Sequence, residues 1–547
     1  MGKLAYKTLP DHQNKSWPSG INYIIGNEGC ERFSYYGMNA ILYIYCVTLF
    51  VSNSLGQDEA SNMATSTVHL FKTGVYAFPM IGAIIADRFL GKYNTILYLS
   101  LVYCLGHVVL SFTEGSIYGM AVGLGLIAIG SGGIKPCVSA HVGDQFGKGN
   151  WNLLQKVYQI FYFIINFGSF FAVLLIPLVK EWFGWRVAFL IPGVLMFIAT
   201  FIFWLGRKSF VHIPPNPGKS LGFFDSLSSV LLFLTFGSLF FTAQKSFLTI
   251  ILVSLSCFVS GLLLFFYRQK LQKDDGFLSV SLFMVKDYFS NLFYKRNLAL
   301  AYVGSNSGPL LSPQSTSHNA QREFGDEAVE GVKAVGRIIS IFIMVSIFWA
   351  LFDQHSSSWI RQAEMMDLSL YLPIFGEITM LSSQIPSLNP IMVMALIPFW
   401  AYVVEPFLSR LGIAMTPLKK MTLGMLLASF SFVAVALLQG KIDADPSIKI
   451  HVLWQIIPYL LITTSEVLVS ITGLEFAYSQ APKRMKSTVM GFWLLSVALG
   501  NVLVALLARF SHLALENFFW LFALLMALAG LVFAIRAKNY QVKDYTQ

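Results

Sequence analysis

The chain of 547 residues is 55% hydrophobic and only 12% charged, and its formal net charge is +10. This composition is typical of a polytopic membrane protein and excludes a soluble globular domain, which could not bury so large an apolar fraction. The basic residues form short clusters between apolar runs, so they indicate membrane topology, and no nucleic-acid partner is expected. The five cysteines are scattered singly, so neither a disulfide framework nor a metal site is predicted.

The first apolar run contains a group of charges in the sequence GNEGCERFSYY, residues 26–36. If this run is helical, Glu28, Glu31, Arg32 and Tyr36 share one face, because side chains three and four residues apart are neighbours. Each unpaired charge at that depth costs at least roughly 2.5–3.5 kcal/mol. Two acids facing one base leave a surplus negative charge, which a proton removes most cheaply. A salt bridge that only packs helices together is the plainer alternative.

Fourteen apolar runs are long enough to cross roughly 30 Å of hydrocarbon, which takes about 20 helical residues. Basic residues fall in alternate connections, which places both termini on the cytoplasmic side. We expect the following organisation: a cytoplasmic N-terminus at 1–20, a six-helix bundle at 21–206, an inserted transmembrane hairpin at 207–270, a flexible cytoplasmic linker at 271–336, a second six-helix bundle at 337–536 and a cytoplasmic tail at 537–547.

A weak internal sequence repeat supports an organisation in two related halves. The sequence DRFLGK at 87–92 follows the second run, and PFLSRLG at 406–412 follows the corresponding run of the second half. Parallel repeats of this kind build one large class of secondary transporters, whose site lies near mid-membrane between the halves. The turn from Asp87 to Gly91 resembles the loop of the major facilitator superfamily, in which the acid caps a helix and the glycine allows a tight reversal.

Other polar residues inside apolar runs are candidate functional groups, because such residues are rare at membrane depth. His69, Lys72 and Tyr76 share a face of the second run. A lone histidine is more often a packed, hydrogen-bonded side chain, yet histidine also titrates near physiological pH. The role of Lys72, one turn from His69, stays open.

Two more polar groups belong to the first half. Lys135 in the fourth run needs a buried partner, and Glu28 and Glu31 are the nearest candidates within the same half. Tyr162 and Asn166 lie one turn apart on the fifth run. All of them are kept as candidate site residues.

Charged and aromatic residues recur in the second half. Trp349 and Asp353 share one face of the ninth run, which begins near Arg337. The 16 residues between the two charges span about 24 Å of helix, so Arg337 cannot pair with Asp353. Glu405, near the end of the next run, is the better partner. Arg337 and Glu405 join Asp87 as gating or structural candidates.

Three further positions complete the candidates. Asn389 opens the tenth run beside a proline, Glu466 lies inside the twelfth run, and Trp493 lies in the thirteenth. Tryptophan is about as often an anchor at the membrane interface as a ligand contact here. All three are kept as candidate site residues.

These residues together carry a family resemblance. The stretch from Glu28 to Tyr36 resembles the ExxERFxYY motif of the proton-dependent oligopeptide transporter (POT) family of the major facilitator superfamily. GIKPCVSAHVGDQF, FYFIINFGS, FWALFDQ and TGLEFAYSQAP resemble further signatures, so the likeness covers about residues 20–535. The hairpin resembles the two additional helices of prokaryotic members, and the connection at 439–451 is too short for the large extracellular domain of mammalian members.

The resemblance implies an all-α polytopic fold of the major facilitator superfamily, with two six-helix bundles plus a two-helix insertion, or 14 transmembrane helices. It implies a symporter, not an enzyme, that imports di- and tripeptides by alternating access. The proton would be the coupling ion, and no cofactor is expected. We expect a multi-pass protein of the bacterial inner membrane, embedded in the lipid bilayer and functional as a monomer.

The resemblance also implies roles for matching residues. Arg32 and Lys135 would attract the peptide carboxylate, and Asn166, Asn389 and Glu466 would hold the amino end. The aromatic residues implied to line the pocket are Tyr36, Tyr76, Tyr162, Trp349 and Trp493.

Proton coupling is implied for a second set of residues. Glu28 and Glu31 would couple their proton state to the network of Arg32 and Lys135. His69 matches the functionally important histidine of animal members, and Asp353 matches an acid opposite it. We therefore expect His69 and Asp353 to interact across the halves in an outward-open state.

Two other functions stay open. A symporter of another small anion or metabolite within the same superfamily is the first, and the complete ExxER motif with Lys135 and Glu466 argues against it. A membrane-embedded enzyme or a respiratory proton-pumping subunit is the second. The sequence contains no HExxH, GxSxG, haem-type histidine pair or nucleotide loop that would favour it.

Overall fold

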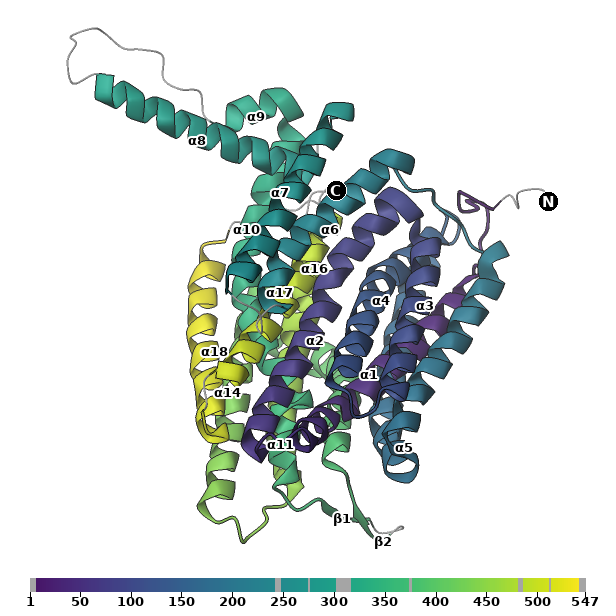
Figure 1. The fold of residues 1–547 in the computed structure, drawn as a ribbon, viewed down its shortest axis with the longest axis vertical. Coiled ribbons are helices and arrows are strands. Elements are labelled where there is room, and N and C mark those ends of the chain that lie inside the picture. Colours follow the sequence, from purple (N-terminus) through teal and green to yellow (C-terminus); the bar gives the residue numbers. More distant parts are fainter. Residues whose placement is uncertain are drawn as a thin grey trace.

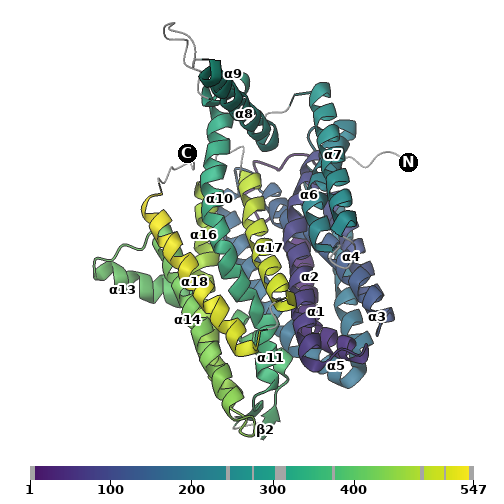
Figure 2. The same ribbon diagram turned by 60° about the vertical axis from the view of Figure 1, so that its left-hand side comes forward.

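The computed structural model describes residues 6–241, 247–273, 276–301, 316–372, 376–480, 486–510 and 513–540. Most of the described chain is helical, and the long helices run side by side (Figures 1 and 2). A short hairpin of strands β1 (Ser369–Leu372) and β2 (Gly376–Thr379) lies at one end, called the strand end below (Figure 1). Helices α8 (Phe277–Ala301) and α9 (Thr316–Phe324) lie at the opposite end, called the linker end.

The first half is formed by helices α1 to α5. Helix α5 has 52 residues, which at about 1.5 Å each would far exceed the roughly 30 Å of hydrocarbon. It breaks at Gly184, whose φ of +79° is readily adopted only by glycine, so it contains two of the expected spans. The elements are α1 (Ile21–Ser52), α2 (Gln57–Ile85), the π-helical turn η1 (Ala86–Leu90), α3 (Lys92–Phe112), α4 (Ile117–Asp144) and α5 (Leu154–Leu205).

The inserted hairpin consists of α6 (Lys219–Phe241) and α7 (Phe247–Leu271), which pack against each other. The carboxylate of Asp225 on α6 lies 2.5 Å from Nε of Arg268 on α7. The same carboxylate lies 3.5 Å from Nη1 of Arg88 in η1, and α6 also contacts α2. The hairpin is therefore anchored to the first half.

The segment expected to be a flexible linker is helical over much of its described length. Helix α8 projects away from the bundle, and α10 (Asp326–Phe352) begins well before the expected boundary at residue 337 (Figure 1). Residues 302–315, which carry much of the Gly, Ser and Pro, lie outside the described residues. Helices α8, α9 and α10 share a small apolar core of Val280, Ala320, Ala328 and Val329.

The second half contains helices α10 to α18, two of whose membrane spans include π-helical turns. These turns are η7 (Trp400–Val404), between α12 and α13, and η9 (Val467–Ile471), between α15 and α16. The other elements are η5 (Asp353–Ser356), α11 (Ser358–Glu364), α12 (Leu388–Phe399), α13 (Glu405–Arg410), α14 (Pro417–Ala444), α15 (Ile456–Glu466), α16 (Thr472–Ser479), α17 (Lys486–Phe510) and α18 (Leu515–Lys538). Short 3-10 turns occur at 151–153, 206–208, 382–387 and 452–455.

The antiparallel β1–β2 hairpin was not expected from the sequence. It pairs Ser369 with Thr379 and Leu372 with Gly376. The alternation in SLYL, followed by a glycine with a φ of +73° at 376, is the signal that could have predicted it.

The buried residues form two large cores, one in each half, as expected for two bundles. Within the described residues, twelve helices are long and apolar enough to cross a membrane, and one of them is the broken 53-residue segment Lys156–Lys208. The number of fourteen spans therefore stays a prediction, whereas the all-helical, polytopic architecture is confirmed.

Candidate functional site

A polar cavity lies between the two halves. Its wall is formed by α1, α2 and α5 of the first half and by the end of α10, η5, the turn at 382–387, α12 and α15 of the second. It has a volume of about 690 Å³ including its open mouth. The expected site residues on this wall are Tyr36, Tyr76, Asn166, Asp353, Asn389 and Glu466. Tyr35, Lys72 and His355 also line it, and none of these three is predicted to do so from the sequence.

The α1 cluster consists of Glu28, Glu31 and Arg32, which lie together on one face of α1 as predicted. Nε of Arg32 donates a 2.7 Å hydrogen bond to Oε1 of Glu28 and lies 3.2 Å from Oε2 of Glu31. Both acids are at most 2% exposed. Within the described residues, Oε2 of Glu28 and both oxygens of Glu31 receive no hydrogen bond. The guanidinium of Arg32 is thus the cation for two buried carboxylates, and three of their four oxygens accept no hydrogen bond from the described residues.

Lys135 does not pair with the acids of the α1 cluster, so that expectation is wrong for this structure. Its Nζ lies over the rings of Tyr35 and Tyr76, 4.3 Å and 4.4 Å from their centroids, which partly compensates a buried cation. Nζ has no hydrogen-bond partner within the described residues. Helix α4 reaches this position because Gly132 packs directly against Phe78 of α2, where a side chain would clash.

Lys72 pairs with Asp353 across the two halves. Its Nζ donates to Oδ1 of Asp353 at 2.8 Å, to the carbonyl oxygen of Asp353 at 3.1 Å and to Oγ of Ser356 at 2.7 Å. These three bonds use all three protons of the ammonium group. The role that the sequence left open for Lys72 is therefore that of the cation opposite Asp353.

Asn501 of α17 connects this pair to His69. Nδ2 of Asn501 donates to Oδ2 of Asp353 at 2.6 Å, and Oδ1 of Asn501 lies 2.7 Å from Nδ1 of His69. Nε2 of His69 lies 2.8 Å from Oγ of Ser357. The direct contact expected between His69 and Asp353 is replaced by this bridge. We call His69, Lys72, Asp353 and Asn501 the interhalf cluster.

The carboxylate expected at the amino end of a ligand lies on the second half. Nδ2 of Asn389 donates to Oε2 of Glu466 at 2.7 Å and to Oγ1 of Thr463 at 3.3 Å. No ion pair to Glu466 occurs within the described residues, although the side chain faces the cavity. On the first half, the amide of Asn166 donates to the carbonyl oxygen of Tyr162 at 2.9 Å.

The two tryptophans expected in the pocket lie in the core of the second half. Trp349 and Trp493 are 8% and 3% exposed, and their rings meet edge to face at 6.1 Å. Trp493 also packs on Phe342 and closely against Gly473. Neither belongs to the cavity wall described here, because each fills space between helices of its own half.

The expected partnership of Arg337 and Glu405 is wrong. Arg337 lies 2.9 Å from Glu330, two turns earlier on α10, and Glu405 lies 2.7 Å from Lys420. Because α10 begins at Asp326, before the expected boundary at residue 337, Glu330 on the same helix can pair with Arg337. Gly91 after Asp87 has a φ of +80°, which fits the predicted tight reversal, while capping by Asp87 stays a prediction.

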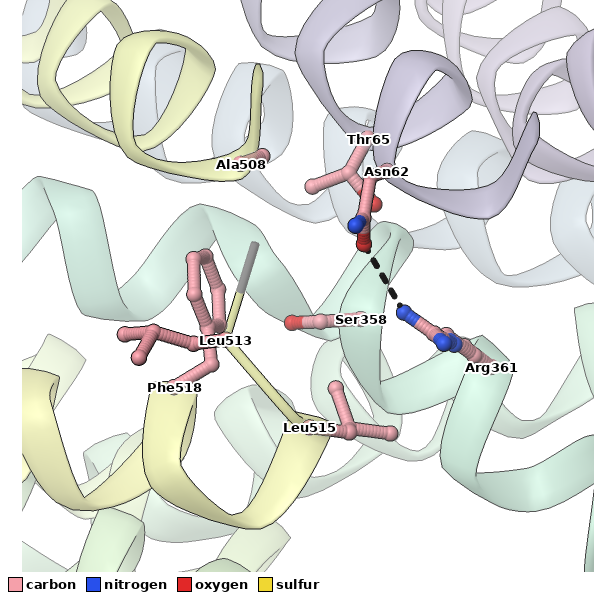
Figure 3. Close-up of a pocket in the computed structure, with 8 residues that line it drawn as sticks. All are labelled: Asn62, Thr65, Ser358, Arg361, Ala508, Leu513, Leu515 and Phe518. Carbon is pink, nitrogen blue, oxygen red and sulfur yellow. Dashed lines mark hydrogen bonds between the residues drawn. The ribbon is translucent and has the colours of Figure 1, made fainter. Parts of the chain in front are cut away.

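The strand end is closed by further contacts between the halves. The guanidinium of Arg361 on α11 donates to Oδ1 of Asn62 at 3.0 Å and to Oδ1 of Asp58 at 2.9 Å, both near the start of α2. Figure 3 shows the bond to Asn62 beside a small pocket at this junction. Nε2 of Gln384 donates to the carbonyl oxygen of Leu174 on α5 at 2.8 Å. With the interhalf cluster, these contacts join the halves at this end.

Two helical halves with separate cores, joined at the strand end around a shared polar cavity, define a membrane transporter with the major facilitator superfamily fold. The chain belongs to the POT family, whose sequence model matches residues 93–521.

Comparisons with characterised proteins agree with this assignment. Peptide transporter family 1 of Drosophila melanogaster is 34% identical over 441 residues, which cover 78% of this chain and 48% of that protein. The chain thus spans about half the length of that relative. Solute carrier family 15 member 2 of Rattus norvegicus is 25% identical over 98% of this chain and 91% of that protein.

Solved structures show the same architecture over nearly the whole chain. An auto-inhibited POT family peptide transporter superposes with a TM-score of 0.76 and 36% identity, covering 97% of this chain and 99% of its own. The POT family transporter PepTSo superposes with a TM-score of 0.75 and 38% identity over the same shares.

Proposed function

We propose that this chain is a proton-coupled symporter that imports di- and tripeptides by alternating access. The Drosophila relative and the auto-inhibited POT protein are both named as peptide transporters, which supports the assignment. The family and these relatives are transporters, so a membrane-embedded enzyme or respiratory subunit is not favoured.

The observation that carries this proposal is a pair of buried charges, one in each half, that have no ion-pair partner among the described residues. Nζ of Lys135 in the first half lies 4.4 Å from the centroid of the cavity-lining ring of Tyr76 and has no hydrogen-bond partner among the described residues. Glu466 of the second half faces the same cavity without a cation among those residues. A peptide with free ends would bring a carboxylate towards Lys135 and Arg32 and an ammonium towards Glu466. Both buried charges would then gain partners, and a buried charge without a partner is strongly unfavourable.

The α1 cluster is our candidate for the proton site. Arg32 faces two carboxylates, and Glu31 receives no hydrogen bond from the described residues, so a proton on Glu31 would remove the surplus negative charge. Protonation would also release Arg32 from Glu31, which leaves its charge available to the peptide carboxylate. Loss of the proton would restore the ion pair and favour peptide release. Proton and peptide would thus be coupled through Arg32.

The interhalf cluster would act as the outer gate, with the strand end facing the outside. Lys72 already neutralises Asp353, so this gate needs no proton to stay closed. Opening would require Lys72 and Asp353 to separate, together with Arg361 and its partners at the mouth. This arrangement makes His69 a supporting hydrogen-bonded residue.

We place the linker end and both termini in the cytoplasm of a bacterial cell, with the bundle in the inner membrane. The positive residues of alternate connections support this orientation. The cavity is lined by both halves of one chain, which supports a monomer as the transporting unit.

The proposal is tested by uptake of labelled dialanine into proteoliposomes with an imposed inward proton gradient. We expect accumulation that collapses with a protonophore and is competed by unlabelled trialanine. Transport of another small anion or metabolite, with dialanine ignored by folded protein, would replace peptide as the substrate. Accumulation that persists without a proton gradient would overturn proton coupling.

A further inference from the structure

We propose that His355 selects among peptides by accepting a hydrogen bond from the side chain at the amino end of the bound peptide. Peptides with a hydroxyl, amide or ammonium side chain at that position are favoured over apolar peptides of the same shape. This inference rests on the proposed peptide transport, and it concerns a residue just beyond the FWALFDQ stretch that carried the family resemblance.

The first step is the place of His355 in the cavity. It belongs to η5, between the cavity-facing residues Asp353 and Ser356, and its ring is partly buried on the cavity wall. The ring packs against Phe352, with centroids 4.9 Å apart, and edge to face against Tyr459 at 6.5 Å. Oη of Tyr459 also donates to the carbonyl oxygen of His355 at 3.3 Å. The imidazole is therefore held in place before a ligand arrives.

The second step is the proton arrangement of the ring. Nδ1 of His355 lies 2.6 Å from the carbonyl oxygen of Phe352. A carbonyl oxygen only accepts, so Nδ1 carries the proton, and Nε2 of the neutral ring is an acceptor. No described residue donates to Nε2.

The third step is that neighbouring polar groups are already engaged. Lys72 uses its three protons on Asp353 and Ser356, and Oγ of Ser356 donates to the carbonyl oxygen of Asp353 at 3.0 Å. Nε2 of His355 is thus left for water or for a ligand. An apolar side chain placed against it would remove the water without replacing its hydrogen bond, which is unfavourable.

The half of the protein that carries His355 indicates which residue of the peptide lies nearest to it. Asn389 and Glu466, our candidates for the amino end, lie on the same half and on the same cavity wall. The side chain of the first residue is therefore the nearer one.

The test uses counterflow exchange at pH 7.5 on both sides of the membrane, with labelled dialanine and unlabelled competitors. Thr-Ala is compared with Val-Ala, and Gln-Ala with Met-Ala, because each pair differs mainly in polarity. The wild-type chain should prefer the polar member roughly three- to tenfold, the range of one neutral hydrogen bond. His355→Met should abolish the preference, and His355→Gln, of similar shape but with an acceptor, should keep it.

Dialanine exchange itself separates this inference from the proposed function. If wild-type chain exchanges dialanine but shows no preference within the pairs, or if His355→Met retains the preference, the selector role is refuted. If wild-type chain does not exchange dialanine, the peptide function fails and the selector role fails with it. His355→Leu replaces His355→Met if the latter loses dialanine exchange, and a preference confined to the Ala-Thr and Ala-Gln series would overturn the assigned position.

Discussion

The two buried charge clusters differ in where they come from and in how well they are satisfied. The α1 cluster is local, since its three residues lie within one turn and a half of a single helix. The interhalf cluster joins residues from α2, η5 and α17, and Lys72 is 281 positions from Asp353. The local cluster leaves carboxylate oxygens without hydrogen bonds, whereas Asp353 accepts from both Lys72 and Asn501.

This difference suggests that the two clusters have different functions. A buried network whose donors and acceptors are all paired resists a change of charge, because any added proton would displace an existing partner. A cluster with two carboxylates and one cation gains from a proton. The satisfied cluster is therefore suited to hold the halves together, and the unsatisfied one to carry the coupling ion.

The largest expected effect comes from removing the cation of the interhalf cluster. Lys72→Met should lower the free energy of unfolding by about 3–5 kcal/mol, because the Asp353 carboxylate would stay buried without its partner. The double variant Lys72→Met/Asp353→Asn should recover much of this loss. Thermal unfolding of purified protein measures both.

Lys180→Met is the matched control, since Lys180 pairs with half-exposed Glu181 at the surface. This substitution should lower the free energy of unfolding by less than about 1 kcal/mol. A Lys72→Met variant no less stable than this control would contradict the gate role.

The next largest effect concerns ligand binding by Lys135. Lys135→Met should weaken dialanine binding roughly 10- to 100-fold, because a hydrogen-bonded charge contributes about 1.5–3 kcal/mol. The affinity for dialanine amide, which lacks the carboxylate, should fall little in the same variant. Calorimetric titration measures the affinity of both peptides for wild type and variant. Lys273→Met is the control, because Lys273 forms an exposed ion pair with Glu323. Equal losses for the two peptides would show that Lys135 does not face the carboxylate.

Removing the proton site should abolish accumulation but spare exchange. A pH gradient of one unit drives at most about tenfold accumulation per proton, or about 1.4 kcal/mol. Glu31→Gln should reduce the accumulation ratio to about one, while counterflow of dialanine continues. Proteoliposome uptake measures both, and Glu323→Gln at the surface is the control. Retained accumulation would move the coupling site away from Glu31.

The smallest effect is expected at His69. His69→Gln should keep proton-driven accumulation within about twofold of wild type, because the interhalf cluster has its own fixed cation in Lys72. The lost contacts to Asn501 and Ser357 would cost about 1 kcal/mol each in stability. Uptake as a function of external pH checks the prediction. A collapse of accumulation would restore His69 as the proton acceptor.

The sequence predicted what depends on short distances along the chain. Glu28, Glu31 and Arg32 follow helical spacing, so their shared face and the pairing of Glu28 with Arg32 could be expected. The hydropathy of the runs likewise predicted two helical bundles. The pairing of Lys72 with Asp353 could not be predicted, because it depends on how α2 and η5 meet between the halves.

Other errors had identifiable physical causes. The sequence predicts a flexible linker at residue 330, so it does not predict Glu330 as the partner of Arg337, whereas α10 is already helical there. Trp349 and Trp493 were expected in the pocket, but each is large enough to fill a gap within its own bundle. The place of His355 could not be predicted from helical spacing, because residues 353–356 form a 3-10 turn after α10 that faces the cavity.

The ion pairs of Asp225 make the inserted hairpin a suitable place for a spectroscopic probe of domain motion. Because this carboxylate ties α6 to both Arg268 and Arg88, a probe on the hairpin should report the orientation of the whole first half. Leu263 on α7 and Leu531 on α18 are 65% and 57% exposed, and neither belongs to the cavity wall. Spin labels at these two sites, after replacement of the native cysteines, would follow the tilt between the halves without altering a residue that contacts the ligand.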